Sequence, residues 1–245
     1  MLLAAAALLT VPDATGDMRG DGSYVLPTRP ALNPDALDLR ELQVQDVGGR
    51  LQLRVGLGAV QNLWNAPLGY SAGVLDVFVK SRLGGATDLA GLGFSAAGSG
   101  GWQYHLRVSG FGSSLEFVPD GQTRPQPRTT PLTVQLSGST VVIGTPIPSG
   151  QYSYWVTMSV YSPFTPDGYL RPSTGGGESS LQVTALNAPL PVDVIGVTPQ
   201  AQAYRTHQLG AVGQTRDRRA LLLLLLAVAG LVLAVVFTVL VWRKR

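Results

Sequence analysis

An uncharged apolar run near the C-terminus constrains this chain more than any other feature. Residues 220–242 read ALLLLLLAVAGLVLAVVFTVLVW, which is 23 consecutive residues without a charge. As an α-helix this run extends roughly 34 Å, enough to cross a bilayer core of about 30 Å. The sequence therefore predicts one transmembrane helix over 220–242 in contact with the lipid bilayer, followed by a basic cytoplasmic tail over 243–245.

The basic residues of the chain gather around this run. The net charge is +3, but residues 216–245 hold six of the 18 basic residues and only one of the 15 acidic ones. The part before residue 216 keeps 12 basic and 14 acidic residues, a net charge of −2. Because basic residues flank both ends of the run, counting them does not decide its orientation. The basicity belongs to the anchor, so we expect no nucleic-acid partner.

The N-terminal segment 1–10, MLLAAAALLT, resembles the apolar part of a truncated signal peptide, although it lacks a basic start. The alternative is a buried N-terminal strand or helix. With a signal at this end, the chain is expected to be a single-pass protein of the cell membrane with its N-terminal domain outside. The chain contains no cysteine, which excludes disulfides, thiol nucleophiles and cysteine-ligated metals.

Between these ends the sequence is typical of an all-β fold. Alternating apolar and polar residues, separated by Gly, Pro, Ser and Asp clusters, form eight short runs. These runs are 37–47, 50–57, 74–80, 102–109, 114–118, 132–136, 140–143 and 151–161. With 30 glycines and 17 prolines in the chain, they predict an antiparallel β-sandwich over 11–190 with little helix. The Pro/Gly-spaced residues 191–219 predict a juxtamembrane linker.

The last run, 151–161, has two unlike faces because side chains alternate along a strand. Val156 and Met158 lie on the more apolar face, which we expect to point into the core. Trp155 and Thr157 lie on the opposite face.

Catalytic chemistry has little support in the sequence. Residues 69–73, GYSAG, match the motif that exposes a serine nucleophile, but a strand is predicted after Ser71 where that motif needs a helix. Only His105 and His207 could serve as its base. A cleft that held His105 beside a carboxylate and Ser71 would indicate an enzyme. We predict instead that the chain is not an enzyme and has no catalytic residue.

An acidic, glycine-bearing loop near the N-terminus suggests a metal site. Asp13, Asp17 and Asp21 alternate with glycines in the stretch PDATGDMRGDGSY. Calcium needs several oxygen ligands at about 2.3–2.6 Å, and glycines allow backbone carbonyls to join the carboxylates. The spacing does not fit an EF-hand loop. The sequence predicts a calcium site formed by these three aspartates, with solvated Asp/Gly turns as the alternative.

Several segments occur in an order that can be compared with a known family. They are DATGDMRGDGSYVLPT, ALDLRELQV, NLWNAPLGYS, VLDVFV, GWQYHLRVSG, PDGYLRP, GGG, PVDVIGV and AQAYRTHQL. Together they resemble the C-terminal glucodextranase-like domain family, over Pro12 to Leu209. The resemblance implies a β-sandwich similar to carbohydrate-binding and DOMON-like modules, with a noncatalytic surface role. It also implies calcium, because the family's D-x-x-G-D opening maps onto Asp13, Gly16 and Asp17. Met18 departs from the family, which usually has a second consecutive acid there.

A sugar-binding module needs an exposed aromatic ring for the apolar face of a pyranose and polar groups for its hydroxyls. Trp64 lies in the loop-like stretch NLWNAPLG, between Asn62 and Asn65 and near Tyr70. We predict that these four residues form the ligand site. The alternative is that Trp64 folds back over the core.

Taken together, these features predict a noncatalytic, membrane-anchored surface module that binds glycan or another cell-envelope component. The main alternative is a structural cell-envelope protein that binds no ligand and packs against neighbouring proteins. A more distant alternative is an accessory protein associated with a hydrolase.

Overall fold

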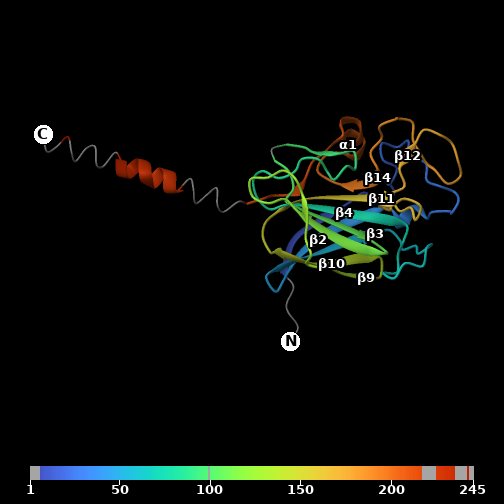
Figure 1. The fold of residues 1–245 in the computed structure, drawn as a ribbon, viewed down its shortest axis with the longest axis horizontal. Coiled ribbons are helices and arrows are strands. Elements are labelled where there is room, and N and C mark those ends of the chain that lie inside the picture. Colours follow the sequence, from blue (N-terminus) through green and yellow to red (C-terminus); the bar gives the residue numbers. More distant parts are fainter. Residues whose placement is uncertain (1–5, 99, 217–224, 235–241, 243–245) are drawn as a thin grey trace. The chain divides into compact units, whose positions relative to one another are not determined.

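The structure is a computed structural model that describes residues 6–98, 100–216, 225–234 and 242 (Figure 1). The chain divides into two compact units, Met1–Thr215 and Arg216–Arg245. The named strands, the short 3-10 helix η1 (Pro34–Ala36) and the helix α1 (Gln200–Thr206) all lie in the first unit. The first unit is therefore an all-β domain, as the sequence predicts.

The strands of this domain are short and numerous. They are β1 (Ala6–Pro12), β2 (Leu39–Val47), β3 (Arg50–Leu57), β4 (Gly73–Lys80), β5 (Ser95–Ala96), β6 (Tyr104–Ser109), β7 (Gly112–Phe117), β8 (Gln126–Pro127), β9 (Thr133–Ser137), β10 (Thr140–Pro148), β11 (Ser153–Val160), β12 (Pro172–Ser173), β13 (Leu181–Gln182), β14 (Pro191–Ile195), β15 (Gln208–Leu209) and β16 (Val212–Gly213). Each of the eight predicted runs overlaps one of them, so the prediction of these strands is confirmed.

Two antiparallel sheets make the sandwich. The five-stranded sheet has the order β1-β2-β3-β10-β9. The seven-stranded sheet has the order β14-β11-β4-β6-β7-β8, and β16 also pairs with β11. Figure 1 shows β2, β3 and β10 on one side of the domain and β4, β11 and β14 on the other. Two small parallel pairs, β12-β13 and β15-β5, lie outside these sheets.

Burial follows the alternation of the sequence in the five-stranded sheet. In β2 and β3, side chains such as Leu42, Val44, Leu53 and Val55 are buried, and the residues between them are half-buried. In β4 and β11 nearly every residue is buried, so both faces of the seven-stranded sheet are covered at its centre. One face meets the other sheet, and loops cover the second, outer face.

The face of β11 that points away from the core is not exposed to solvent. Trp155 is buried, and its indole Nε1 donates a hydrogen bond to the carbonyl oxygen of Leu209 at 2.8 Å. Thr157 is also buried. The apolar face with Val156 and Met158 points into the core as predicted, but the opposite face is buried as well, because residues from the C-terminal part of the domain lie over it.

The prediction of a linker over 191–219 is wrong for the residues that the structure describes. Residues 191–195 form β14, which pairs with β11, and α1 follows directly after residue 199. Tyr204 in α1 and Leu209 in β15 are buried. The Pro and Gly residues in this stretch separate short elements that pack on the sandwich, so they do not mark an extended tether.

The two chain ends also differ from expectation. Residues 6–12, which overlap the predicted signal peptide over 1–10, form β1 and pair with β2 at the edge of the smaller sheet. This agrees with the alternative of an N-terminal strand, although β1 is largely exposed. The predicted span over 220–242 falls mostly outside the described residues. Its described residues, 225–234 and 242, are helical, and no helix in the described part of the chain is long and apolar enough to cross a membrane.

Candidate functional site

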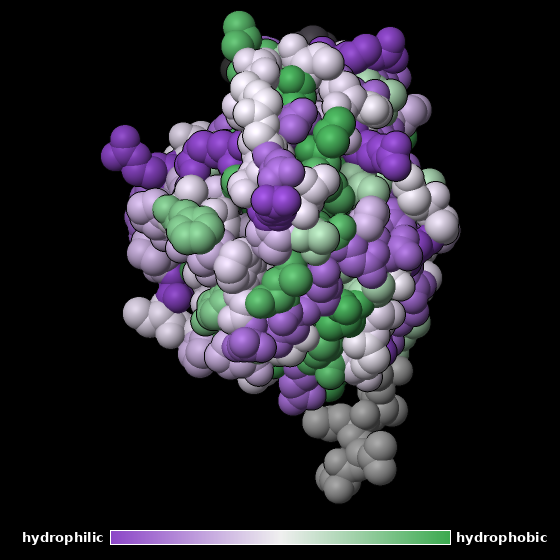
Figure 2. Space-filling view, turned by 90° about the vertical axis from the view of Figure 1, so that its right-hand side faces the viewer, coloured by the Kyte–Doolittle hydropathy of each residue, from purple (hydrophilic) through white to green (hydrophobic). Residues whose placement is uncertain are grey.

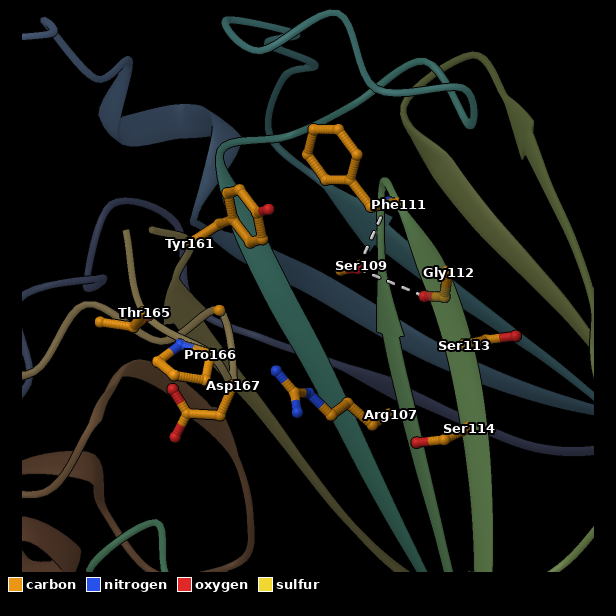
Figure 3. A pocket seen from close by; sticks show the side chains of 11 residues that line it. Arg107, Ser109, Phe111, Gly112, Ser113, Ser114, Tyr161, Thr165, Pro166 and Asp167 are labelled. Carbon is orange, nitrogen blue, oxygen red and sulfur yellow. Dashed lines mark hydrogen bonds between the residues drawn. The ribbon is translucent and has the colours of Figure 1, made fainter. Parts of the chain in front are cut away.

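A groove of about 280 Å³ lies between the β6–β7 hairpin and the loop 161–168 (Figure 3). We call it the hairpin groove. The hairpin contributes Arg107, Ser109, Phe111, Gly112, Ser113 and Ser114, and the loop contributes Tyr161, Thr165, Pro166, Asp167 and Gly168. The groove therefore combines aromatic rings, hydroxyl groups and two charged side chains of opposite sign, which is a composition that suits a polar ligand with apolar faces.

Two aromatic pairs lie at this groove and next to it. The rings of Phe111 and Tyr161 stack with centroids 5.1 Å apart and an interplanar angle of 24°, and Figure 3 shows them side by side. Trp64 meets Phe164 edge to face, with centroids 6.1 Å apart. Phe111 is 46% exposed and Phe164 is 86% exposed. Exposed rings of this size are available to stack on a ligand.

The three segments that carry these rings are tied together by backbone contacts. The amide of Leu68 donates to the carbonyl oxygen of Gly110 at 3.1 Å, which joins the Trp64 loop to the turn that carries Phe111. A side chain at Gly110 would collide with the carbonyl oxygen of Tyr70. The loop 161–168 is closed by a hydrogen bond from the Ser162 amide to the Gly168 carbonyl oxygen at 2.9 Å. The rings are thus presented by a fixed framework, which limits the entropy lost on binding.

A buried polar network lies on the same face of the sheet, beside the groove. His105 is 5% exposed, and its Nε2 contacts Asp76 at 2.8 Å while its Nδ1 contacts Glu116 at 3.2 Å. The hydroxyl of Tyr169 donates to both oxygens of Asp76 at 2.9 Å. Burial alone would lower the pKa of His105, but the hydrogen bonds to the two carboxylates outweigh it, so the pKa is raised. The two carboxylates therefore favour the charged form of His105.

This arrangement also prevents His105 from acting as the base for a serine nucleophile. Both of its ring nitrogens face carboxylates, so neither is free to accept a proton from Ser71. The Ser71 hydroxyl oxygen accepts a hydrogen bond from the Trp64 amide at 2.9 Å, and Ser71 is buried. Ser71 holds the Trp64 loop, and the geometry of a serine hydrolase is absent among these residues.

A second candidate site lies where the N-terminal loop meets β14. Asp13, Asp17 and Asp193 each place one carboxylate oxygen within 4.8 Å of the others. Ligands on opposite sides of a calcium ion lie about 5 Å apart, so these oxygens can share one ion. One oxygen of Asp13 and one of Asp17 are buried with no hydrogen-bond partner in the described residues. We call this group the aspartate cluster.

The electrostatics of the aspartate cluster favour a cation. Burial, followed by the charge of Asp17, raises the pKa of Asp13 to about 7. Burial also raises the pKa of Asp17. Burial raises the pKa of Asp193 to about 8, even though that carboxylate accepts a hydrogen bond from the Leu39 amide at 2.6 Å. Three crowded carboxylates with raised pKa values lack the positive charge that a bound divalent ion would supply.

Two further residues fix the loop of the aspartate cluster. Gln200 of α1 donates through Nε2 to the carbonyl oxygens of Asp17 and Gly20, and its Oε1 is buried without a hydrogen-bond partner among the described residues. Asp38 accepts the Gly16 amide at 3.0 Å and pairs with Arg40 at 2.7 Å. Since Arg40 already neutralises Asp38, this fourth aspartate is the least suited to a metal.

Comparison with known proteins identifies the family of this chain. A family model described as the C-terminal binding-module, SLH-like, of glucodextranase matches residues 8–161. The match spans more than half of the 245-residue chain. The chain belongs to this family. A search of curated proteins gave no match. The glucodextranase binding-module family is noncatalytic in kind, which agrees with the expectation that the chain is not an enzyme.

The family match ends at Tyr161, so both candidate sites extend beyond it. Within the match lie most of β1, all of β2 to β11, the Phe111 turn, Asp13 and Asp17. Asp167, Asp193 and Gln200 come from the part that follows. This later part, up to Thr215, belongs to the same compact unit as the matched residues.

The predicted ligand residues separate into two groups. Trp64 is half-buried, with its ring beside the exposed Phe164, and Asn65 is exposed with a left-handed backbone (φ 51°). The Asn62 side chain is exposed, but its amide binds both the N–H and the carbonyl oxygen of Ala66. Tyr70 is 3% exposed, so it is a core residue and cannot meet a ligand from solvent. Its inclusion in the predicted site is corrected here.

The predicted metal ligands also need one correction. Asp21 does not join Asp13 and Asp17, because its Oδ1 accepts the amide and the hydroxyl of Ser23 at 2.9 and 2.6 Å in an exposed local turn. Asp193, which follows Asp17 by more than 170 residues, is the third member of the aspartate cluster instead. Met18, which stands where the family usually has a second acid, is buried and contributes to the hydrophobic interior.

Sequence reasoning missed most of the hairpin groove. Tyr161 was visible as an aromatic residue at the end of a predicted strand. Phe111 and Phe164 sit in Gly/Ser and Pro-rich turns, where nothing in the pattern marks them as neighbours. Their proximity arises from the packing of three separate loops.

Proposed function

We propose that this protein is a noncatalytic binding module of the cell surface that holds glycan, or another polar component of the cell envelope, in the hairpin groove. The observation that carries the proposal is the stacked pair Phe111 and Tyr161 lining a groove that also contains hydroxyl groups. Aromatic faces match the apolar faces of pyranose rings, and hydroxyl and charged groups match their rims. Membership of a binding-module family supports the same role.

The site proposed from the structure is broader than the one predicted around Trp64. Trp64 and Phe164 form a second aromatic pair next to the groove, joined to the first through the loop 161–168. A polymer that occupied the groove could extend over this second pair. Asn65 lies exposed beside Trp64 and offers an amide to such a ligand.

We propose further that the apolar run 220–242 anchors the module in the lipid bilayer as a single span. Its support is the sequence itself, since 23 uncharged residues are long enough to cross. Envelope glycans lie outside the cell membrane, so we place the binding domain outside and residues 243–245 in the cytoplasm.

A calcium ion at the aspartate cluster is the third element of the proposal. Asp13, Asp17 and Asp193 would hold the ion, and the buried, unpartnered oxygens of the first two support the fit. Calcium there would neutralise the carboxylates and join the N-terminal loop to β14. Its role is structural, because the cluster and the groove share no residue.

The proposed function is tested by retention of the full chain, purified in detergent, on a panel of immobilised neutral, acidic and amino-sugar polysaccharides. Retention on at least one polymer is expected. Phe111→Ala should weaken it about three- to tenfold, which is the value of one aromatic stacking contact. The matched control is Leu186→Ala, which removes an exposed apolar side chain from another loop and should change nothing.

The same experiment addresses the structural alternative. A packing module would present a continuous apolar surface, whereas on the face shown in Figure 2 apolar residues form a narrow, broken band between hydrophilic ones. If the full chain is retained on none of the polymers, the binding role fails and the structural role replaces it.

A further inference from the structure

Arg107 has an unusual position in the hairpin groove. It is half-buried on β6, and the central carbon of its guanidinium lies 4.2 Å from the centre of the Tyr169 ring. Among the described residues it forms no ion pair and no side-chain hydrogen bond. Stacking on Tyr169 therefore fixes the plane of the guanidinium while its five N–H donors keep no protein acceptor.

The Tyr169 ring is itself held in place. Its hydroxyl donates to both oxygens of the buried Asp76, which in turn contacts His105. The surface on which Arg107 rests is thus connected to the interior of the sheet. A planar donor group on such a surface is oriented before any ligand arrives.

The other charges near Arg107 are already matched. Asp167 lies across the groove in Figure 3, but its carboxylate receives two hydrogen bonds from Arg171, at 3.2 and 2.6 Å. These bonds lower the pKa of Asp167. Glu116, on the neighbouring strand β7, contacts His105, and the charge of Arg107 contributes to lowering the pKa of Glu116. Arg107 is therefore the charged residue lining the groove that forms no ion pair in the described part of the chain.

We propose that Arg107 selects acidic glycans by binding the carboxylate of a uronic-acid-type sugar while that sugar, or the next one, stacks on Phe111 and Tyr161. This inference rests on the proposed glycan-binding function and names its ligand class. The planar fork of a guanidinium matches the two oxygens of a carboxylate. Ser114, which lines the same groove, offers a hydroxyl to the sugar rim. One guanidinium can bind one carboxylate of the ligand in this bidentate manner.

The first experiment compares two ligands on the unmodified protein. Affinity of the full chain in detergent is measured for a polyuronate and for the same polymer after chemical reduction of its carboxylates to alcohols. The polyuronate should bind about ten- to a hundredfold more tightly, as expected for hydrogen bonds to a charged group. A polymer of glycerol phosphate serves as a third ligand, and stronger binding to it than to the polyuronate would overturn the choice of carboxylate.

Variants then assign the preference to Arg107. Arg107→Gln should bring polyuronate binding down to the level of the reduced polymer. Arg54→Gln, which removes the same charge from β3 in the other sheet, should leave the preference intact. If Arg107→Gln does not fold, the comparison of the two polymers with the unmodified chain still decides whether a carboxylate is recognised.

The outcomes separate the two proposals. Equal binding of the polyuronate and its reduced form overturns the selection of acidic sugars and leaves glycan binding in place. A preference that survives in a folded Arg107→Gln variant overturns the role of Arg107. Absence of binding to every glycan overturns the proposed function and this inference together.

Discussion

Substitution of Asp193 by Asn should abolish the response of the protein to calcium. In the aspartate cluster three carboxylate oxygens lie within 4.8 Å of one another. Two full charges at that separation repel by about 3–4 kcal/mol at an effective dielectric constant of about 20. A bound divalent ion replaces this repulsion with attraction. Asp193→Asn removes one of the three carboxylates that would bind the ion, so it should weaken calcium binding.

The expected size of the response follows from mass action. Calcium at a hundredfold excess over its Kd stabilises the folded state by about 2.7 kcal/mol. The folded unit Met1–Thr215 has 215 residues, for which 1 kcal/mol corresponds to about 2–4 °C in Tm. The unmodified chain should therefore melt about 5–11 °C higher in calcium than in chelator. The variant should show little difference between the two conditions.

Thermal melting of the full chain in detergent, followed by near-UV circular dichroism of its tryptophans, measures these shifts. The matched control is Asp21→Asn, because Asp21 belongs to a local turn with Ser23 and lies outside the cluster. It should keep the full calcium shift. Equal shifts in Asp193→Asn and the unmodified chain would refute the cluster as the metal site. Loss of the calcium-dependent Tm shift in Asp21→Asn would show that Asp21 is a ligand, as predicted from the sequence.

Three other predictions concern the groove, the buried network and the topology. Trp64→Ala should weaken glycan retention and cost less than the about 3–5 kcal/mol of a buried tryptophan, because Trp64 is half-buried; unfolding on urea titration would instead make it a core residue. His105→Gln should be more destabilising at pH 6 than at pH 9. Because the pKa of His105 is raised in the folded state, its charged form stabilises the fold fully below about pH 6.5, and this stabilisation is lost as the pH rises through the folded-state pKa. Urea titrations in which the variant loses the same free energy of unfolding at both pH values would contradict this. Protease added to intact cells should remove the domain 11–190, and protection until lysis would reverse the proposed orientation.

The sequence predicts the strands well where period-two alternation is strong. β2 buries Leu42 and Val44, and β3 buries Leu51, Leu53 and Val55, with half-buried residues between them, so this part of the pattern directly reflects one core-facing side. β11 was also predicted, with its apolar face toward the core, but the pattern does not show that Trp155 and Thr157 on the other face are buried as well. Alternation reports that two faces differ in polarity. It does not report whether a loop covers the more polar one.

The short C-terminal elements escaped prediction for a related reason. β14 has five residues, α1 has seven, and β15 and β16 have two each. Elements this short show no measurable periodicity, and the intervening Pro and Gly residues are those of a linker. What fixes β14 is pairing with β11 and the hydrogen bond from the Leu39 amide to Asp193, both of which are long-range contacts.

The candidate sites, too, could be predicted only in part, because their residues come from distant parts of the sequence. Asp13 and Asp17 were predicted from a local glycine-bearing loop, and the structure keeps them together. Asp193 could not be paired with them, because only the sheet topology brings β14 to the N-terminal loop. Asp21 has the same local appearance as its two neighbours, yet Ser23 is its partner. Local spacing identified a cluster of oxygen donors, and the fold decided which of them converge.

The placement of polar residues on the seven-stranded sheet connects its architecture to its proposed role. In an ordinary sandwich the outer face meets water and needs no internal partners. Here Asp76 and His105 on that face are buried, so each must find a partner within the protein. They find them in each other, in Glu116 and in Tyr169, which lies just beyond the loop 161–168. The network that satisfies the sheet therefore also holds the ring on which Arg107 stacks, so stability of the sheet and orientation of the groove depend on the same contacts.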